Sequence, residues 1–313
     1  MTANIVEVPA RAHLAGNPSD GYGGAVVSTT VPGLAATVTA TPDDVFAISG
    51  PGESWSSMDD LASTTRRLGY DGGDRLVRAA LVTLDRHLGP GVERRPGRFE
   101  WSTTIPRSVG LGGSSALVVA TMRAALALWE AEAPTTAIGL AELALAAETH
   151  ELAIAAGLAD RAVQVIGGVV LTDCRSGPTA TPVDVAHDPG LTLLWNEDAA
   201  APSGDYHADL RRAFSVGDAA TVAGVGHLAA LADRAADAIE RGDTSELAAA
   251  LDGSLETRCQ LGSVPAAALD GVDELRMSGA AVNFAGSGGA LVVLGPCAAP
   301  DGWSSSALPL TGV

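Results

Sequence analysis

Along several short stretches of the chain, apolar residues alternate with small or polar ones, which is the pattern of a strand with one buried face. This alternation predicts strands at Ile5–Leu14 and Ala25–Ala40, on either side of the turn-rich segment Gly16–Gly24. It also predicts a half-buried strand from Phe99 to Ile105, ended by Pro106. Short apolar runs further along predict strands at Val169–Thr172, Leu191–Trp195, Ala281–Phe284 and Ala290–Leu294.

Between these strands, apolar residues recur at the spacing of helices. Strands and helices mix in both halves without the regular alternation of a doubly wound sheet, so the predicted fold class is α+β. Glycine and proline between Arg175 and Thr181 indicate a crossing between two lobes, residues 1–180 and 181–313. The predicted helices are Leu76–Leu88, Ser115–Glu130, Ala137–Ala156, Ala159–Ile166, one or more within Asp209–Arg241, Ser245–Leu261 and Pro265–Ser278.

Composition and charge exclude several classes of protein. The chain has 313 residues, 47% hydrophobic and 18% charged, as in globular proteins. A net charge of −18 argues against nucleic acid or an anionic membrane as partner. Cys174, Cys259 and Cys297 lie far apart, which predicts reduced thiols in a cytoplasmic protein. The first residues lack a secretion signal and the apolar runs are short, so we expect neither secretion nor a membrane span.

The chain contains no lysine, and all 19 of its basic side chains are arginine. A Walker A phosphate loop requires lysine, and Schiff-base chemistry requires its amine, so both are excluded. Any phosphate held here is bound by backbone amides, arginine or a metal ion.

A glycine-rich loop lies between the strand at Phe99–Ile105 and a long apolar helix, at Pro106–Ala116. Gly110, Gly112 and Gly113 permit close approach of the backbone to a ligand, and the helix N-terminus behind them favours an anion. Ser114 and Ser115 add hydroxyls for a helix cap or for Mg²⁺. An ordinary serine-capped loop remains an alternative. A dinucleotide loop is disfavoured because the preceding strand alternates and does not open the chain.

Two carboxylates, Glu148 and Asp160, lie twelve residues apart around the helix break at Gly157. Glu148 lies in a helix that is apolar almost all round, where an unpaired carboxylate is costly. One carboxylate could bind Mg²⁺ while the other faces an attacking hydroxyl. Equally, Asp160 could complement a helix dipole and Glu148 could reach solvent.

Two further segments are polar or glycine-rich turns beside strands. The segment Arg11–Gly24 runs from a strand into a turn with Asn17, Ser19 and Asp20, which suits the hydroxyls of a polyol but also a plain hairpin loop. Gly286–Gly289 lies between two apolar strands and could approach a phosphate or simply bend the chain.

Taken in chain order, the motifs Arg11–Gly24, Pro106–Ala116 and Gly286–Gly289 resemble those of the GHMP superfamily, named for galacto-, homoserine, mevalonate and phosphomevalonate kinases. Their spacing covers nearly the whole chain. Within the superfamily the chain is most similar to the glucuronokinase family, plant-type enzymes that phosphorylate glucuronic acid at C1. The likeness rests on the turn Gly16–Asp20, where most relatives have Gly-Glu-His-Thr-Asp, on Ala156–Arg161 with Gln164, and on Phe284–Ala290.

The resemblance implies an N-terminal lobe like domain 2 of ribosomal protein S5, which binds ATP and substrate, and a ferredoxin-like C-terminal lobe. It implies that Asp160 is the catalytic aspartate and that Arg11 orients it. It also implies that Ser115 and Glu148 bind Mg²⁺, although the motif does not decide whether Ser114 or Ser115 is the metal ligand. Mevalonate-type relatives place a lysine beside the aspartate, so its absence favours the arginine arrangement of galactokinase-like members. The implied ATP-binding residues are Pro106, Gly110, Leu111, Gly112, Gly113, Ser114, Ser115, Ala116, Gly286, Ser287, Gly288 and Gly289.

The implied substrate is a sugar or uronic acid, D-glucuronate phosphorylated at its anomeric hydroxyl, held by Asn17, Ser19 and Asp20. A substrate carboxylate favours an arginine, for which Arg161 is preferred over Arg107 and Arg258. Alternatives are another GHMP kinase of a different sugar, an isoprenoid alcohol or an amino-acid alcohol, an ATP-dependent decarboxylase, and an inactive binding module on the same scaffold.

Overall fold

The computed structural model describes residues 3–49, 54–133, 136–199, 203–262, 264 and 269–311. The chain divides into two units that are interleaved in the sequence. The first unit contains residues 1–10, 33–105 and 113–156, and the second contains residues 11–32, 106–112 and 157–313. Strands β1 (Asn4–Ala15) and β2 (Ala25–Pro42) pair with each other, and each has residues in both units.

The sheet of the first unit follows the strand order β4-β3-β5-β2. The second half of β2 is antiparallel to β5, with Val38 opposite Trp101 and Ala40 opposite Phe99. Because side chains alternate between the faces of a strand, Phe99 is buried while Glu100 is exposed. This confirms the predicted alternation at the start of the stretch, but Ser102, Thr103 and Thr104 are all exposed and the strand ends at Thr103, before the predicted end at Ile105. The strands not yet given bounds are β3 (Phe46–Ile48), β4 (Ser54–Trp55) and β5 (Gly97–Thr103).

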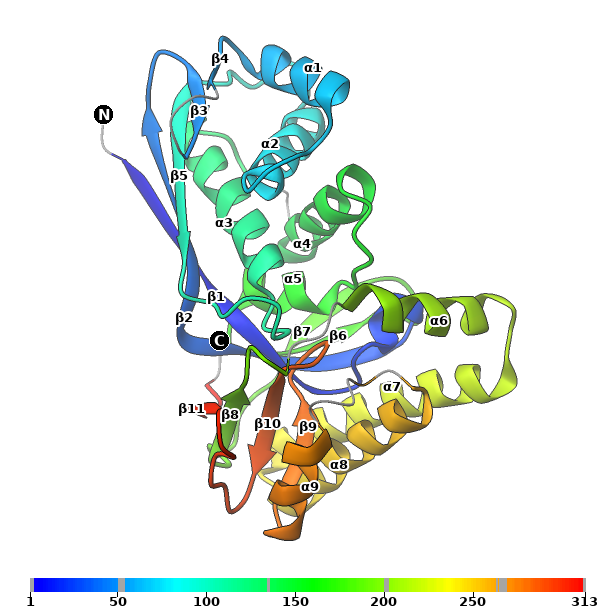
Figure 1. The fold of residues 1–313 in the computed structure, drawn as a ribbon. Helices are drawn as coiled ribbons and strands as arrows, with labels where there is room; N and C mark the ends of the chain where they lie inside the picture. The colour runs from blue at the N-terminus through cyan, green and yellow to red at the C-terminus, as the bar shows by residue number, and fades with distance from the viewer. Residues whose placement is uncertain are drawn as a thin grey trace. The chain divides into compact units, whose positions relative to one another are not determined.

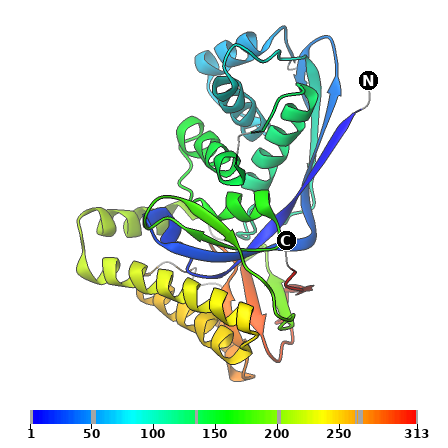
Figure 2. The same cartoon turned by 180° about the vertical axis from the view of Figure 1, so that it is seen from behind.

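Helices of the first unit cover one face of this sheet (Figures 1 and 2). Side-chain oxygens cap two of them: Ser57 accepts the N–H of Asp60 at 3.1 Å, and Thr136 accepts the N–H of Gly139 at 3.1 Å. The helix that follows the glycine-rich loop is apolar and buried along almost its whole length. These helices are α1 (Met58–Leu68), α2 (Arg75–Leu88), α3 (Gly113–Leu128) and α4 (Ala137–Ala146).

The helix predicted at Ala137–Ala156 is shorter than expected. After α4 the chain continues as a single π-helical turn, Ala147–Glu151, and Ala153 then adopts a positive φ of 52°. The N–H of Ile154 donates to the carbonyl of Glu148 at 2.9 Å, which closes this end of the segment. Glu148 therefore lies in a π-helical turn rather than in an α-helix. Such turns widen the backbone spiral and often occur at functional sites.

In the second unit the first half of β2 pairs with β6 (Val169–Asp173), and β6 pairs with β7 (Thr179–Pro182), both antiparallel. The stretch Arg175–Thr181 connects β6 to β7 and includes the start of β7. Its glycine and proline serve a turn. Helix α5 (Ala159–Ile166), predicted with these bounds, precedes β6.

A separate antiparallel sheet of the second unit has the strand order β11-β8-β10-β9. Leu194, Phe284, Leu291 and Val293 belong to the core cluster formed with it, together with Leu255 of α8. Helices α7 and α8 cover one face of this sheet (Figure 2, yellow). The elements are β8 (Leu191–Trp195), β9 (Ala281–Phe284), β10 (Ala290–Leu294), β11 (Ser304–Leu308), α6 (Ser203–Ser215), α7 (Ala219–Arg241), α8 (Thr244–Gln260) and α9 (Leu269–Met277).

The strands form two sheets, and strands and helices do not alternate regularly along the chain, which confirms the predicted α+β class. Of the helix predicted at Pro265–Ser278, residues 265–268 lie outside the described residues and the rest contains α9. The division at residue 180 stays a prediction, as does a cytoplasmic location. Over the described part of the chain no single helix has the length and apolar character to cross a membrane; Ala208–Ser215 with Ala219–Arg241 meets those criteria only as a pair bent by 110°.

Candidate active site

Asp160 lies in the first turn of α5 and forms an ion pair with Arg11 of β1. The Nε atom of Arg11 is 2.8 Å from Oδ1 of Asp160, and Nη2 donates to Oδ2 at 2.8 Å. The Arg11 side chain is 6% exposed and that of Asp160 is 19% exposed, so the pair is largely shielded from water. The structure thus brings together the two residues predicted to act in catalysis.

Arg11 also joins the glycine-rich segments. Its Nη1 donates to the carbonyl of Gly110 and, at 3.0 Å, to the carbonyl of Ala285. The N–H of Arg11 donates to the carbonyl of Leu111 at 3.1 Å. One side chain therefore links the strand of the first motif, the loop before α3 and the turn after β9.

The two glycine-rich segments contact each other directly through their backbones. A Cβ atom at Gly286 would lie 2.0 Å from the carbonyl oxygen of Gly110, and one at Gly110 would lie 2.7 Å from the N of Ser287. Gly110 also has a φ of 86°, which disfavours other residues. Glycine is thus required at both positions by the packing of these segments. The Nε2 of Gln164 donates to the carbonyl of Gly112 at 2.9 Å, one residue before α3 begins.

His13 is a second side chain in contact with Asp160, and the sequence patterns did not predict this role. Its Nε2 is 2.9 Å from Oδ1 of Asp160, and its Nδ1 is 2.8 Å from Oγ of Ser28. Arg11 and His13 are two residues apart on β1 and therefore point to the same face. That spacing is the signal by which His13 could have been found.

The charges around this cluster shift its pKa values. Burial alone would raise the pKa of Asp160, but the charge of Arg11 and the hydrogen bond from His13 outweigh it and hold that pKa well below its usual value. Burial and the charge of Arg11 lower the pKa of His13 to about 4. At neutral pH the cluster therefore holds an ionised Asp160, a charged Arg11 and a neutral His13.

Asp20 lies in the short 3₁₀ turn Ser19–Tyr22, and its carboxylate contacts the start of α5. Its Oδ2 accepts the N–H of Ala159 at 2.9 Å. A Cβ atom at Gly157 would lie 2.1 Å from the same oxygen, so glycine is required there. Burial raises the pKa of Asp20 to about 6, with Asp160 adding to the shift and the N–H of Ala159 opposing it.

The other residues predicted to bind substrate are largely buried around this turn. The amide of Asn17 donates to the carbonyl of Gly286 at 3.4 Å. The hydroxyl of Ser19 is fully buried and donates to the carbonyl of Ala25 at 2.7 Å, which stabilises the turn. Their predicted contacts with a sugar stay predictions.

The three candidate arginines for a substrate carboxylate occupy different surroundings within the second unit. Arg161 donates from Nη1 to the carbonyl of Gly157 at 2.8 Å, lies 3.6 Å from Oδ2 of Asp160 and is 3% exposed. Arg258 is buried with its guanidinium 5.1 Å from the ring centre of Phe284, and burial lowers its pKa to about 10. Arg107 is exposed in the glycine-rich loop.

The predicted metal ligands belong to the first unit. Ser115 and Glu148 are both fully buried, whereas Ser114 is exposed. A hydroxyl and a carboxylate oxygen are the kind of ligand that Mg²⁺ prefers, and Mg²⁺ takes its remaining ligands from water and phosphate. Ala116 and Gly113 lie with Ser114 and Ser115 in the first turn of α3, whose free N–H groups suit a phosphate. These residues therefore fit the predicted groups.

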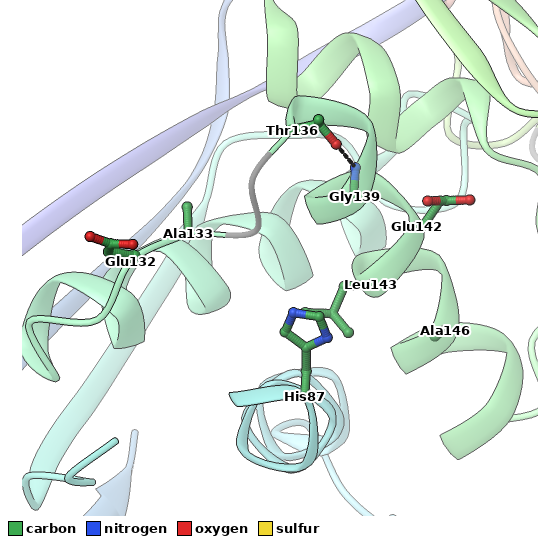
Figure 3. Close-up of a pocket in the computed structure, with 8 residues that line it drawn as sticks. All are labelled: His87, Glu132, Ala133, Thr136, Gly139, Glu142, Leu143 and Ala146. Carbon is green, nitrogen blue, oxygen red and sulfur yellow. Dashed lines mark hydrogen bonds between the residues drawn. The ribbon is translucent and has the colours of Figure 1, made fainter. Parts of the chain in front are cut away.

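The first unit also has a groove of about 550 Å³ on another part of its surface (Figure 3). Leu143 and His87 lie in it, with the carboxylates of Glu132 and Glu142 at its sides. No residue that the sequence predicts for the site lines it. The groove is therefore separate from the predicted chemistry.

Comparison with known proteins places these features in a family. Residues 75–168 match the family of GHMP kinases N terminal domains. Glucuronokinase 1 of Arabidopsis thaliana is 30% identical over 92% of this chain and 83% of its own length. Probable glucuronokinase 2 of the same plant is 31% identical over 92% of this chain and 83% of its own length.

The fold is likewise similar to that of solved structures. The Lactococcus lactis galactokinase, complexed with galactose, matches with a TM-score of 0.78 at 14% identity, over 99% of this chain and 94% of that one. This confirms the predicted GHMP kinase fold. Because the chain resembles glucuronokinases over most of their length, it belongs to the GHMP kinase superfamily and is a phosphotransferase with an alcohol group as acceptor.

Proposed function

We propose that this chain is an ATP-dependent kinase that phosphorylates the anomeric hydroxyl of a uronic acid, D-glucuronate, and forms glucuronate 1-phosphate. The observation that carries this proposal is the ion pair of Arg11 and Asp160, joined through Arg11 to both glycine-rich segments. The similarity to two plant glucuronokinases supports the choice of substrate.

In this proposal Asp160 is the catalytic residue. Its depressed pKa keeps it ionised at neutral pH, so it accepts a hydrogen bond from the sugar hydroxyl and orients that oxygen for attack. As the new oxygen–phosphorus bond forms, the bond between the γ-phosphorus of ATP and its bridging oxygen breaks and ADP leaves, while the O–H bond of the sugar breaks and its proton passes to the Asp160 carboxylate. Arg11 neutralises the charge of Asp160 in the resting state and fixes the plane of its carboxylate.

The sugar is held beside Asp160 by the turn at Asn17, Ser19 and Asp20. Asp20 is tied by hydrogen bond to the residue that precedes Asp160, so a sugar bound to Asp20 lies next to the catalytic carboxylate. An ionised Asp20 accepts two hydroxyl hydrogens, as polyol binding requires.

Arg161 is proposed to bind the uronate carboxylate. Its guanidinium lies in the same cluster as Asp160, and a planar guanidinium can pair with a carboxylate through two parallel hydrogen bonds. Arg258 is less suited because its guanidinium lies over the ring of Phe284. Arg107 is exposed in the glycine-rich loop, so Arg107→Ala serves as the control variant for Arg161→Ala.

ATP and Mg²⁺ supply the transferred phosphoryl group and the neutralisation of its charge. Ser115 and Glu148 would hold the metal ion, and the loop Pro106–Ala116 with Gly286–Gly289 would hold the phosphates. With no lysine in the chain, the backbone N–H groups of these segments and arginine provide the donors.

The test is identification of the product. Purified chain is incubated with ATP, Mg²⁺ and D-glucuronate, and ³¹P NMR with ¹H coupling assigns the phosphate to a carbon of the sugar. The expected result is phosphate on the anomeric carbon together with stoichiometric ADP. Three results would each contradict the proposal: phosphate on another carbon, release of CO₂, or ADP formation at a rate that does not depend on the sugar.

A further inference from the structure

His13 contacts Asp160 directly, yet neither the sequence motifs nor the proposed mechanism gives it a role. The imidazole is 2% exposed and lies between two partners, Ser28 of β2 and Asp160 of α5. A buried polar side chain held at both ring nitrogens has a fixed orientation.

The two oxygens of Asp160 have different surroundings. Oδ1 lies 2.8 Å from Nε of Arg11 and 2.9 Å from Nε2 of His13. Within the described residues, Oδ2 has one nitrogen at hydrogen-bond distance, Nη2 of Arg11 at 2.8 Å, and Arg161 approaches it only to 3.6 Å. Two nitrogens therefore crowd Oδ1 within 2.9 Å, whereas one lies that close to Oδ2, so a substrate hydroxyl can approach Oδ2 more readily.

The neutral state of His13 determines which nitrogen carries the hydrogen. The charged groups that act on the ring are Arg11 and Arg258, which disfavour protonation, and Asp160, which favours it, and burial decides the balance. An ionised Asp160 has no hydrogen to donate, so Nε2 must carry the ring hydrogen. Nδ1 is then the acceptor for the hydroxyl of Ser28.

We propose that His13 is a positioning residue whose Nε2–H, required by the ionised Asp160 and oriented by the contact of Nδ1 with Ser28, occupies Oδ1 of Asp160 and leaves Oδ2 to meet the substrate hydroxyl. The catalytic part of this inference rests on the proposed function. The tautomer part does not, so the two can fail separately.

The tautomer is read from ¹H–¹⁵N two-bond correlation spectra of chain labelled with ¹⁵N-histidine, with His13→Gln used to assign the signal among the 6 histidines. The expected pattern is the Nε2–H tautomer at neutral pH, unchanged until the pH approaches about 4. Ser28→Ala should shift the Nδ1 resonance, because this nitrogen loses its hydrogen-bond donor, while the ionised Asp160 still keeps the hydrogen on Nε2. A protonated ring at neutral pH, or an Nδ1–H tautomer, would overturn the inference in the parent chain itself.

The catalytic consequence is tested with matched variants. Ser28→Ala leaves His13 in place but removes the hydroxyl that orients its ring, and should lower kcat by about 3- to 10-fold with KM for ATP unchanged, as loss of one hydrogen bond predicts. Thr29→Val is the matched control. It removes a buried hydroxyl at the next position of β2, on the face opposite to Ser28, and should keep the parent kcat.

The conservative variant His13→Gln, which can still donate an N–H, should retain more kcat than His13→Leu. Equal kcat for the parent, Ser28→Ala and His13→Leu would overturn the positioning role while leaving the proposed kinase intact. A parent chain that phosphorylates none of the acceptors would overturn the proposed function and the catalytic part of this inference with it.

Discussion

The carboxylate of Asp20 accepts a hydrogen bond from the backbone N–H of Ala159, the residue before Asp160, at 2.9 Å. A turn near the N-terminus is thereby fixed to the first turn of α5, 139 residues later. In the proposed function this contact sets the position of the sugar relative to the catalytic carboxylate.

Replacing Asp160 tests the catalytic assignment. Asp160→Asn keeps the shape of the side chain but can neither take the proton nor balance Arg11, so kcat should fall by about 10²–10⁴-fold. The measurement is steady-state ADP release, with the melting temperature as a check on folding. A purified, folded variant with the parent kcat would return Asp160 to the role of a helix-dipole acid.

The raised pKa of Asp20 predicts a pH-dependent effect on stability. The folded chain binds this proton up to pH of about 6, whereas an unfolded chain releases it near 3.8. Ionising Asp20 therefore destabilises the folded state as the pH rises through this interval, and the cost persists above it.

Asp20→Asn removes that cost and should raise the free energy of unfolding at pH 7.5 by up to about 3 kcal/mol, while weakening sugar binding. Denaturant titrations at pH 7.5 and pH 4 measure the difference, which should shrink at the lower pH. Asp209→Asn, at a side chain 85% exposed, is the matched control. An equal effect of Asp20→Asn at both pH values would mean that Asp20 is not held in a raised-pKa environment.

Glu148 is predicted to act through the metal ion. Glu148→Gln should raise the Mg²⁺ concentration needed for half-maximal activity by more than it raises KM for the sugar, because the amide is a weaker metal ligand. The control is Glu142→Gln, an exposed acid of the preceding helix that lines the groove in Figure 3. Matching metal titrations for Glu148→Gln and the parent would remove Glu148 from the metal site.

The contact between the glycine-rich segments predicts the effect of a single methyl group. Gly286→Ala would place a carbon 2.0 Å from the carbonyl of Gly110 and 2.9 Å from Nη1 of Arg11, so the segments must separate. We expect a loss of about 1–3 kcal/mol in stability and a higher KM for ATP. Gly226→Ala, where a Cβ atom meets nothing within 4 Å, should leave KM for ATP unchanged and, as a Gly→Ala change inside helix α7, should not lower stability. Equal melting temperatures for the two variants would contradict this packing.

Much of the fold could be predicted because its strands and helices have one buried face and one exposed face. The bounds of α5, β8, β9 and β10 follow directly from apolar runs between glycines and polar turns. Strand β11 could not be predicted, because Ser304–Leu308 is a run of serines whose strand conformation comes from pairing with β8. The short strands β3 and β4 and helix α1 were also missed, for want of a long periodic pattern.

The candidate site was predictable only in part. Apolar periodicity cannot join Arg11 to Asp160, and the pair was expected from family resemblance alone. The π-helical turn Ala147–Glu151 has no sequence signal that separates it from a continuing α-helix. The position of His13 beside Arg11 could be predicted, because residues two apart on a strand share a face. Its contact with Ser28 could not, because that contact depends on how β1 and β2 pair.

The substrate is decided by kcat/KM for D-glucuronate beside galacturonate, glucose, galactose and mevalonate, measured with the same enzyme and saturating ATP. The value for glucuronate should exceed that for glucose by at least about tenfold, since a charged hydrogen-bonded pair with Arg161 contributes about 1.5–3 kcal/mol. Arg161→Ala should reduce that ratio, and Arg107→Ala should not. A neutral sugar or mevalonate with a higher kcat/KM than glucuronate would contradict the proposed substrate while leaving the chain a GHMP kinase.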